Sequence, residues 1–294
     1  MKPGIYEGLS FDEYLGIRAI NKSGLDAFCQ SPAHYFAEYL DPSRKPEKVT
    51  PAKKIGSAIH TAILEPELFY KRYIIAPPDP PNRPTSRQLN AKKPSPETIA
   101  AIQFWKDFDQ TAAGRIALTQ EDFETCMAIG QEIRANAGAQ EFLTGGKSEV
   151  TLVWEDPETG ILCKGRVDYL TPNYAVDLKS AENAAWFEFN RSAFKYGYHR
   201  QDAWYSDGLK VLDPENIRLF VFATFEKAPP RAAAFFFYGD EDREIGRVQN
   251  RDHLKQYGEC LKTAKWPGYP ETLQQLKLPP WAAKKPADQP IQEF

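Results

Sequence analysis

The pattern of apolar and polar positions divides the chain into a helical first half and a mixed second half. Over residues 97–143 apolar side chains recur every three or four positions, which predicts one helix through Phe104 and another from Glu121 to Asn136. From Glu149 the pattern changes to short runs of β-branched and aromatic residues separated by polar turns. These runs predict a β-meander of three strands, at residues 149–154, 161–170 and 174–179.

Further elements flank the predicted meander on both sides. Ser10 and Glu13 have the spacing of a helix capping box, and Ser31 followed by Pro32 marks the start of a later helix. The other expected elements are a helix capped by Ser23, a helix over 55–63 in which Gly56 allows close packing, a helical stretch over 184–212 with a break at 190–192, strands at 217–226 and 232–238, and a helix over 240–264. Together they predict an α/β fold of the α+β type, with a central mixed β-sheet of about five strands flanked by helices.

The chain of 294 residues is long enough for one large domain with a full core. We expect residues 1–145 to form a mainly helical part, 146–265 the core, and 266–294 a packed but irregular extension. The charged, proline-punctuated segment 41–51 is expected to be a loop. Residues 76–96 contain seven prolines and few apolar side chains, which predicts a mobile loop.

Composition and charge limit the kinds of surface that the protein can have. Hydrophobic residues make up 42% of the chain and charged residues 26%, as in ordinary soluble domains. The net charge is 37 − 40 = −3, so any surface for nucleic acid must be a local basic one. No apolar run approaches the ~18 residues of a membrane span and the N-terminus lacks a signal core, so we expect a cytoplasmic protein. The cysteines show no C-x-x-C pair and are expected to be reduced and mostly buried: Cys29, Cys126, Cys163 and Cys260.

Two carboxylates and an ammonium group come together in the predicted meander. Asp168 lies near the end of the second strand, and Asp177 and Lys179 lie two apart on the third, so they share a face. Carboxylate oxygens bind Mg²⁺, which can clamp a phosphate, while a lysine can orient the attacking water. The same residues are also compatible with a solvated strand face that carries a surface ion pair. His60 borders the apolar face of its helix, where a lone histidine is either structural or a ligand.

The order of these elements and residues resembles the PD-(D/E)xK nuclease superfamily, which has a restriction-endonuclease-like core. Several short segments resemble its RecB-like branch, and although each is weak alone, they occur in the order of that branch. These segments are the helices at Ser23–Tyr35, G-x-x-x-H at Gly56–His60, Glu149 at the head of the first strand, G-x-x-D at Gly165–Asp168, D-x-K at Asp177–Lys179 and Q-x-x-x-Y at Gln201–Tyr205. Within the branch, the chain resembles the RecE-type (exonuclease VIII) nuclease domain of phages and prophages.

The resemblance implies a role for each candidate residue. Asp168 and Asp177 would bind Mg²⁺, for which Mn²⁺ can substitute, and the carbonyl of Leu178 and the ring of His60 would complete the ligands. Lys179 would lie beside the nucleophilic water. Glu149 would be an accessory catalytic acid, and the DNA backbone would be held by Gln201, Tyr205, Lys195, His199 and Arg200.

The implied activity is a metal-dependent DNA exonuclease that acts on the ends of linear double-stranded DNA. It would digest one strand from 5′ to 3′ and leave 3′ overhangs for a RecT-type single-strand annealing protein in recombination. The resemblance also implies a ring-shaped homo-oligomer, such as a tetramer, in the cytoplasm of a bacterial host. Three alternatives remain open: a RecB-like single-strand or structure-specific nuclease, a catalytically silent DNA-binding module of the same fold, and an unrelated α+β protein.

Overall fold

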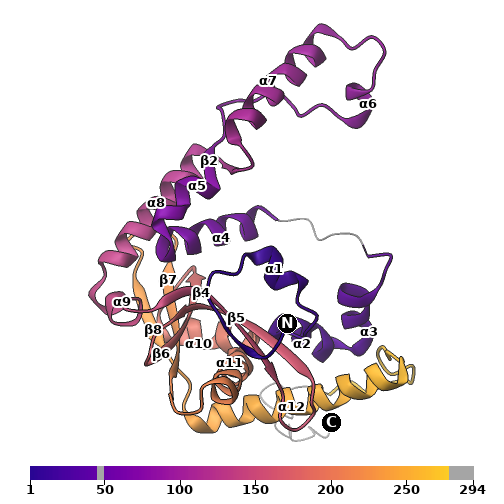
Figure 1. Cartoon of the computed structure of the whole chain (residues 1–294), viewed down its shortest axis with the longest axis vertical. Helices are drawn as coiled ribbons and strands as arrows, with labels where there is room; N and C mark the ends of the chain where they lie inside the picture. The colour runs from indigo at the N-terminus through magenta and orange to yellow at the C-terminus, as the bar shows by residue number, and fades with distance from the viewer. Residues whose placement is uncertain (45–49, 278–294) are drawn as a thin grey trace, which may run out of the picture.

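A six-stranded mixed β-sheet forms the centre of the protein (Figure 1). The computed structural model describes residues 1–44 and 50–277, and the fold is of the α+β class. Along the sheet the order is β1 (Gly4–Tyr6), β4 (Lys147–Glu155), β5 (Leu162–Leu170), β6 (Tyr174–Ala181), β7 (Leu219–Glu226) and β8 (Ala233–Phe236). The predicted mixed sheet is therefore confirmed, with one strand more than expected because the N-terminal segment adds β1 at the edge, beside β4.

The pairing of the strands opens a gap in the sheet between β5 and β6. β6 and β7 are parallel and pair along their full length of eight residues, whereas β4 and β5 form a long antiparallel ladder. Between β5 and β6 the ladder consists of two pairs only, Tyr169 with Val176 and Leu170 with Ala175. Beyond these pairs the two strands part, so side chains from both can enter the gap.

Helices cover both faces of the sheet and continue beyond one end of it. Figure 1 shows α6 and α7 projecting away from the body as an arm, and a small parallel sheet of β2 (Tyr73–Ile75) and β3 (Ile116–Leu118) lies at its base. The helices are α1 (Phe11–Gly16), α2 (Lys22–Gln30), α3 (Pro32–Tyr35), the π-helical turn η1 (Phe36–Leu40), α4 (Pro51–Leu64), α5 (Pro66–Arg72), α6 (Ser86–Leu89), α7 (Pro96–Ala112), α8 (Gln120–Ala135), α9 (Ala137–Phe142), α10 (Trp186–Lys195), α11 (Tyr198–Leu212) and α12 (Asp240–Thr263).

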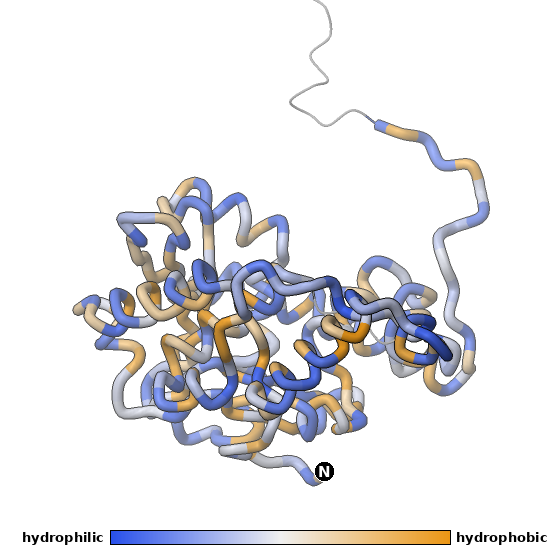
Figure 2. Tube along the Cα trace, turned by 90° about the horizontal axis from the view of Figure 1, so that it is seen from above, coloured by the Kyte–Doolittle hydropathy of each residue, from blue (hydrophilic) through white to orange (hydrophobic). Residues whose placement is uncertain are grey.

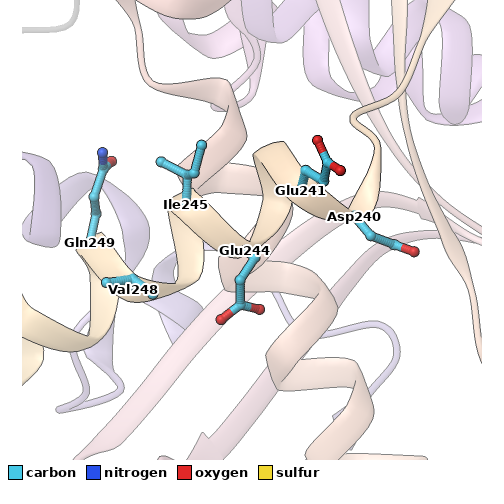
Figure 3. A pocket seen from close by; sticks show the side chains of 6 residues that line it. All are labelled: Asp240, Glu241, Glu244, Ile245, Val248 and Gln249. Carbon is cyan, nitrogen blue, oxygen red and sulfur yellow. The ribbon is translucent and has the colours of Figure 1, made fainter.

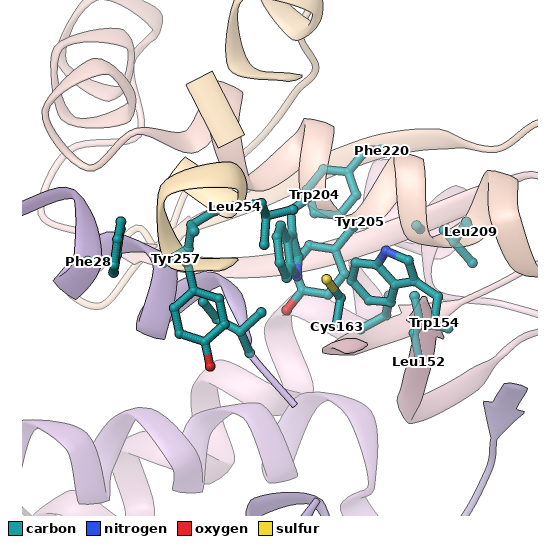
Figure 4. Close-up of a cluster of buried hydrophobic side chains, with 14 of the residues drawn as sticks. Phe28, Leu152, Trp154, Cys163, Trp204, Tyr205, Leu209, Phe220, Leu254 and Tyr257 are labelled. Carbon is teal, nitrogen blue, oxygen red and sulfur yellow. The ribbon is translucent and has the colours of Figure 1, made fainter. Parts of the chain in front are cut away.

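One hydrophobic core joins a face of the sheet to α11 and α12. Trp154 on β4 packs edge-on against Trp204 on α11, with ring centroids 5.1 Å apart. Tyr205, next on α11, stacks on Phe220 of β7 at 5.4 Å (Figure 4). Buried aromatic rings of this size contribute most of the apolar area of a core. They fix α11 over β4, β5 and β7.

A second core joins the opposite face to α4 and α8. Ile59 and Ala62 of α4 are buried together with Leu178 of β6 and Phe225 of β7. α8 approaches α4 closely at Gly130, where a Cβ atom would lie 2.6 Å from the carbonyl oxygen of Ala62. α4 is therefore held firmly against β6 and β7.

Several local predictions are confirmed and others are wrong. The capping box of Ser10 and Glu13 is present, and Ser31 caps α3 with Pro32 in its first turn. Asn21, rather than Ser23, caps α2. The break in the helical stretch after β6 lies at Gly197 and not at 190–192, because that glycine adopts a φ of 64°, which ends α10 and starts α11.

Three more details differ from the expectation. Gly56 is not a packing contact, since nothing lies within 4 Å of the position of its Cβ. The proline-rich stretch 76–96 contains one short helix, α6. β1, β2 and β3 were not predicted, because strands of three residues are too short for a recognisable period.

The C-terminal extension packs at its start and then leaves the body. Trp266 stacks on Tyr35 at 5.7 Å and contacts Tyr257 at 6.0 Å, so the expected packing is present there. Leu273 and Leu276 are fully exposed, and Figure 2 shows this part of the trace running clear of the apolar interior. The rest of the extension, and residues 45–49 of the expected loop, lie outside the described residues. The four cysteines are free thiols. None of the described helices is long and apolar enough to span a membrane.

Candidate active site

The candidate site lies where β5 and β6 part. Asp168 is the residue of β5 directly beyond the short ladder, and its Oδ2 atom accepts a hydrogen bond of 2.7 Å from the backbone N–H of Leu178 on β6. The carboxylate of Asp168 thus accepts the hydrogen bond that Leu178 would otherwise donate to a main-chain carbonyl of β5. This contact fixes one of the predicted acids between the two strands.

Glu149 lies opposite Asp168 on β4, at a point where the ladder is interrupted. The flanking pairs Ser148–Tyr169 and Val150–Val167 are present, but Glu149 has a φ of 54° and does not pair. A left-handed conformation costs a residue with a Cβ atom on the order of 1 kcal/mol, and it persists where the surrounding structure enforces it. Here it places the carboxylate of Glu149 beside that of Asp168.

His60 reaches the same point from α4. Its Nδ1 atom lies 3.6 Å from Oδ2 of Asp168. Donor atoms of His60, Glu149 and Asp168 all lie within 4.8 Å of one another, close enough to bind a single metal ion. An imidazole nitrogen with two carboxylate oxygens suits Mn²⁺ and Mg²⁺. The structure thus joins His60 to residues that lie 89 and 108 positions further along the sequence.

Asp177 and Lys179 form a pair beside this trio. Nζ of Lys179 lies 2.6 Å from Oδ2 of Asp177, and Nε2 of Gln201 on α11 donates a 2.6 Å hydrogen bond to Oδ1. The ammonium group also lies 4.6 Å from the ring centroid of Tyr198, a distance at which a cation–π contact is favourable. Both side chains on β6 are therefore held in place. Asp177, expected as a metal ligand with the carbonyl of Leu178, is not one of the three donors that lie within 4.8 Å of one another, and Glu149, expected as an accessory acid, is.

The electrostatics of the site favour a cation. Burial and the neighbouring carboxylate of Asp168 raise the pKa of Glu149 and of Asp177, although Arg166 and Lys179 act against this. Oδ2 of Asp177 is buried and accepts no hydrogen bond of good geometry, despite the nearby ammonium. Such carboxylates are costly to ionise together. A divalent cation would remove much of that cost, so the residues present fit a metal centre.

Arg166 is a site residue to which the sequence analysis gave no role. Its guanidinium donates to Oε2 of Glu149 at 2.6 Å, to Oγ1 of Thr151 at 3.1 Å and to the carbonyl of Leu9 at 2.9 Å. This three-point support holds the Glu149 carboxylate toward Asp168. Arg166 lies inside the G-x-x-D segment, two positions before Asp168, so alternation along the strand was the signal that could have found it.

The side chain of Tyr205 is buried and supports the fold, and it is not part of an exposed DNA-binding surface. Its hydroxyl donates to the carbonyl of Arg166 at 3.1 Å, and Trp204 donates from its indole to the carbonyl of Lys164 at 3.1 Å. The ring of Tyr205 lies so close to Gly165 that a Cβ atom there would be 2.6 Å away. The expected contact between this hydroxyl and a phosphate is therefore not what the structure shows. Likewise the amide of Gln201 bonds to Asp177.

The predicted basic residues of α10 and α11 have different surroundings. Arg200 is not free for a phosphate, because its guanidinium lies 3.0 Å from Asp26 and donates to Sγ of Cys29, both on α2. His199 hydrogen-bonds to Gln249 on α12 through Nε2 at 2.9 Å. Lys195 is exposed at the end of α10. Of the three, only Lys195 has an exposed side chain that could contact a phosphate.

A hollow of about 710 Å³ on the first turns of α12 is not part of this site (Figure 3). Three of its lining side chains are carboxylates, which disfavour a polyanion, and none is a candidate site residue. The hollow is lined by Asp240, Glu241, Glu244, Ile245, Val248 and Gln249.

The sheet, the split between β5 and β6 and the acid–lysine set define a PD-(D/E)xK-type domain, a class of nuclease folds that generally uses divalent metals. The chain belongs to the family described as PDDEXK-like domain of unknown function (DUF3799), whose model matches residues 21–279.

The comparison with solved structures agrees with this fold. The chain is similar to the crystal structure of a "putative exonuclease" from Eubacterium rectale, with a TM-score of 0.58 and 16% identity over 93% of this chain and 96% of that one. It also matches SSO0001 with a TM-score of 0.27 and 11% identity over 53% of this chain and 69% of that one, a likeness too low to carry an argument. No curated protein matches the chain.

Proposed function

We propose that the protein is a metal-dependent DNA exonuclease that digests linear double-stranded DNA from 5′ to 3′ and leaves 3′ single-stranded overhangs. One observation carries the proposal: three donor side chains from α4, β4 and β5 lie within 4.8 Å of one another. Beside them lies the ion pair of the buried Asp177 with the partly buried Lys179. A structural ion pair would not need an imidazole and two further carboxylates around it.

Each residue of the site would have a separate role in phosphodiester hydrolysis. His60, Glu149 and Asp168 would hold a Mg²⁺ or Mn²⁺ ion, which when bound polarises the phosphate and lowers the pKa of water. Lys179, oriented by Asp177, can donate a hydrogen bond to the attacking water or to a phosphate oxygen that gains charge. Gln201 fixes the other oxygen of Asp177. The water oxygen bonds to phosphorus and releases a proton to solvent, the bond to the 3′ oxygen breaks, and that oxygen takes up a proton, which leaves a 5′-phosphate and a 3′-hydroxyl.

The proposal extends to the biological setting of the reaction. A 3′ overhang is a substrate for strand annealing, and the proposal therefore includes a RecT-type annealing protein as the partner in recombination. A ring-shaped homo-oligomer would allow a chain with net charge −3 to surround DNA with a basic channel.

The experiment compares DNA forms and ends. Linear blunt duplex labelled at the 5′ or the 3′ ends, covalently closed circular duplex and single-stranded DNA are each incubated with Mg²⁺, with Mn²⁺ or with EDTA. The expected result is metal-dependent release of acid-soluble nucleotides from linear duplex only, with early loss of the 5′ label. Preference for single strands would favour the RecB-like alternative. DNA binding without hydrolysis under all metals would overturn the proposal in favour of a silent binding module.

A further inference from the structure

Helix α10 exposes an aromatic face that the site chemistry does not use. Phe189 and Ala193 bury its inner side, whereas Trp186, Phe187 and Phe194 are 67%, 64% and 79% exposed. Three exposed aromatic side chains on a helix of ten residues form an apolar patch, and such patches usually mark a surface that a partner covers. The face therefore indicates a binding function.

Basic side chains alternate with the rings on this face. Phe187, Arg191 and Phe194 have spacings of four and three, which places them along one side of the helix, and Lys195 follows Phe194 at the edge of that side. Glu188 lies 3.3 Å from Arg191 and offsets part of its charge, while Lys195 is exposed. Rings interleaved with cations match a ligand that is aromatic and anionic at a regular spacing.

The face is continuous with the candidate active site. Tyr198 lies beneath the ammonium group of Lys179, with 4.6 Å between Nζ and the ring centroid. Tyr196 stacks on Tyr198 with centroids 6.0 Å apart, and Nζ of Lys195 lies 5.4 Å from the ring centroid of Tyr196. An aromatic and cationic path thus leads from the site to the end of α10.

We infer that this path, from Tyr198 over Tyr196 to the outer face of α10, binds an unpaired single strand of DNA next to the scissile phosphate. Bases stack on exposed rings without sequence preference, and the phosphates between them pair with lysine and arginine. Duplex would fit less well, because its bases are already stacked on one another. The inference rests on the proposed function and adds that the end of the duplex must be opened before cleavage.

The test uses binding in the absence of cleavage. An Asp168→Asn protein is titrated into a fluorescent oligothymidylate of about twelve nucleotides, a length within the range of known single-strand sites, and anisotropy is recorded. Phe187→Ser with Phe194→Ser should weaken binding by about tenfold or more, because each stacked base contributes substantially. Lys195→Glu should weaken it separately and reduce its dependence on salt.

Matched controls replace exposed apolar side chains outside α10. Ile217→Ser with Leu261→Ser, at residues that are 94% and 50% exposed, should leave binding unchanged. Thermal unfolding and size-exclusion chromatography of every variant check folding and oligomeric state. Lys195→Glu, at an exposed position, keeps the test valid if the double serine variant does not fold.

The outcomes separate this inference from the proposed function. Unchanged oligothymidylate affinity in both α10 variants would overturn the inference. A loss of affinity that appears only together with a change of oligomeric state would also overturn it, and would identify the face as a contact between copies of the chain. If the wild-type protein meanwhile releases nucleotides from linear duplex, the proposed function stands in either case.

Discussion

The carboxylate of Asp168 accepts a hydrogen bond of 2.7 Å from the main-chain N–H of Leu178, across a gap where β5 and β6 no longer pair. An acid on one strand is thereby fixed by the backbone of the next strand. Because Leu178 lies between Asp177 and Lys179 in the sequence, the same contact fixes Asp168 relative to both of these side chains. The site is thus built on the place where the sheet opens.

The first prediction concerns pH and metal binding at His60. Burial alone would lower the pKa of this ring, but the carboxylates of Asp168, Asp177 and Glu149 outweigh burial and raise the pKa above 6.5. Without metal, the His60–Asp168 ion pair stabilises the fold fully below pH 6.5, and this contribution is lost as the pH rises through the raised pKa. Metal needs the neutral ring, so metal affinity should rise by up to about tenfold per pH unit over the same window.

Thermal unfolding with and without Mn²⁺, at steps of pH, measures this effect. The increase in melting temperature on adding Mn²⁺ should grow as the pH rises through the raised pKa of His60. His60→Gln retains a polar side chain of similar reach but does not titrate, so its smaller increase should depend less on pH. An identical pH dependence in the variant and the wild type would show that His60 is not a ligand.

The second prediction separates the lysine from the metal ligands. Lys179→Met should lower the single-turnover rate of hydrolysis by about 10²–10³-fold, because it removes a preorganised donor at the reacting phosphate. The stabilisation by Mn²⁺ should remain, since His60, Glu149 and Asp168 are untouched. Lys210→Met, an exposed lysine of α11, is the matched control and should hydrolyse DNA at the normal rate. Equal rates in both variants would remove Lys179 from the mechanism.

The third prediction assigns a positioning role to Arg166. Arg166→Met removes all three of its hydrogen bonds and leaves Glu149 and the carbonyl of Leu9 without their donor. Removing such outer supports typically lowers metal affinity by about 10–100-fold. Calorimetric titration with Mn²⁺ measures the change. Thr151→Val removes a single bond and should have a smaller effect, so that equal losses in the two variants would point to general loosening of β4.

The sequence was sufficient for the parts of the site that depend on local periodicity. Asp177 and Lys179 share a face because strand residues alternate, and the structure places both as that rule requires. The proximity of His60 to Asp168 was predicted only from the order of motifs. Arg166 was missed although alternation places it on the face of Asp168, because its role depends on Glu149 from another strand, and alternation alone does not identify that partner.

The same limit applies to the fold. Long strands and helices were found from their periods, but the break at Gly197 depends on the positive φ of one residue, and the three-residue strand β1 forms only by pairing with β4. The hydroxyl of Tyr205 was expected to be open to DNA, because the sequence does not show that Gly165 lets α11 approach β5 so closely. Glycines at helix contacts are therefore the positions where the structure adds most to the sequence.

The last prediction tests such a glycine where α12 crosses α11, the helix that carries Gln201. At Gly246 a Cβ atom would lie 2.4 Å from the carbonyl oxygen of His199 and 3.0 Å from the backbone nitrogen of Arg200. Backbone atoms cannot rotate away, so Gly246→Ala must displace one helix from the other. The cost of such overpacking, about 1–3 kcal/mol, should exceed the ~1 kcal/mol that alanine gains over glycine in a helix. Urea unfolding should therefore show a lower midpoint for this variant.

Gly258, further along α12, provides the matched control. A Cβ atom there would lie 3.3 Å from Cδ1 of Ile161, the end of a flexible side chain that can move aside. Gly258→Ala should therefore leave the free energy of unfolding unchanged or raise it by up to ~1 kcal/mol. Gly246→Ala should also slow hydrolysis, because a displaced α11 moves Gln201 away from Asp177. If the two alanine variants unfold at the same urea concentration, the crossing at Gly246 is not overpacked by a Cβ atom. If they also hydrolyse DNA at the same rate, this crossing does not hold Gln201 in place.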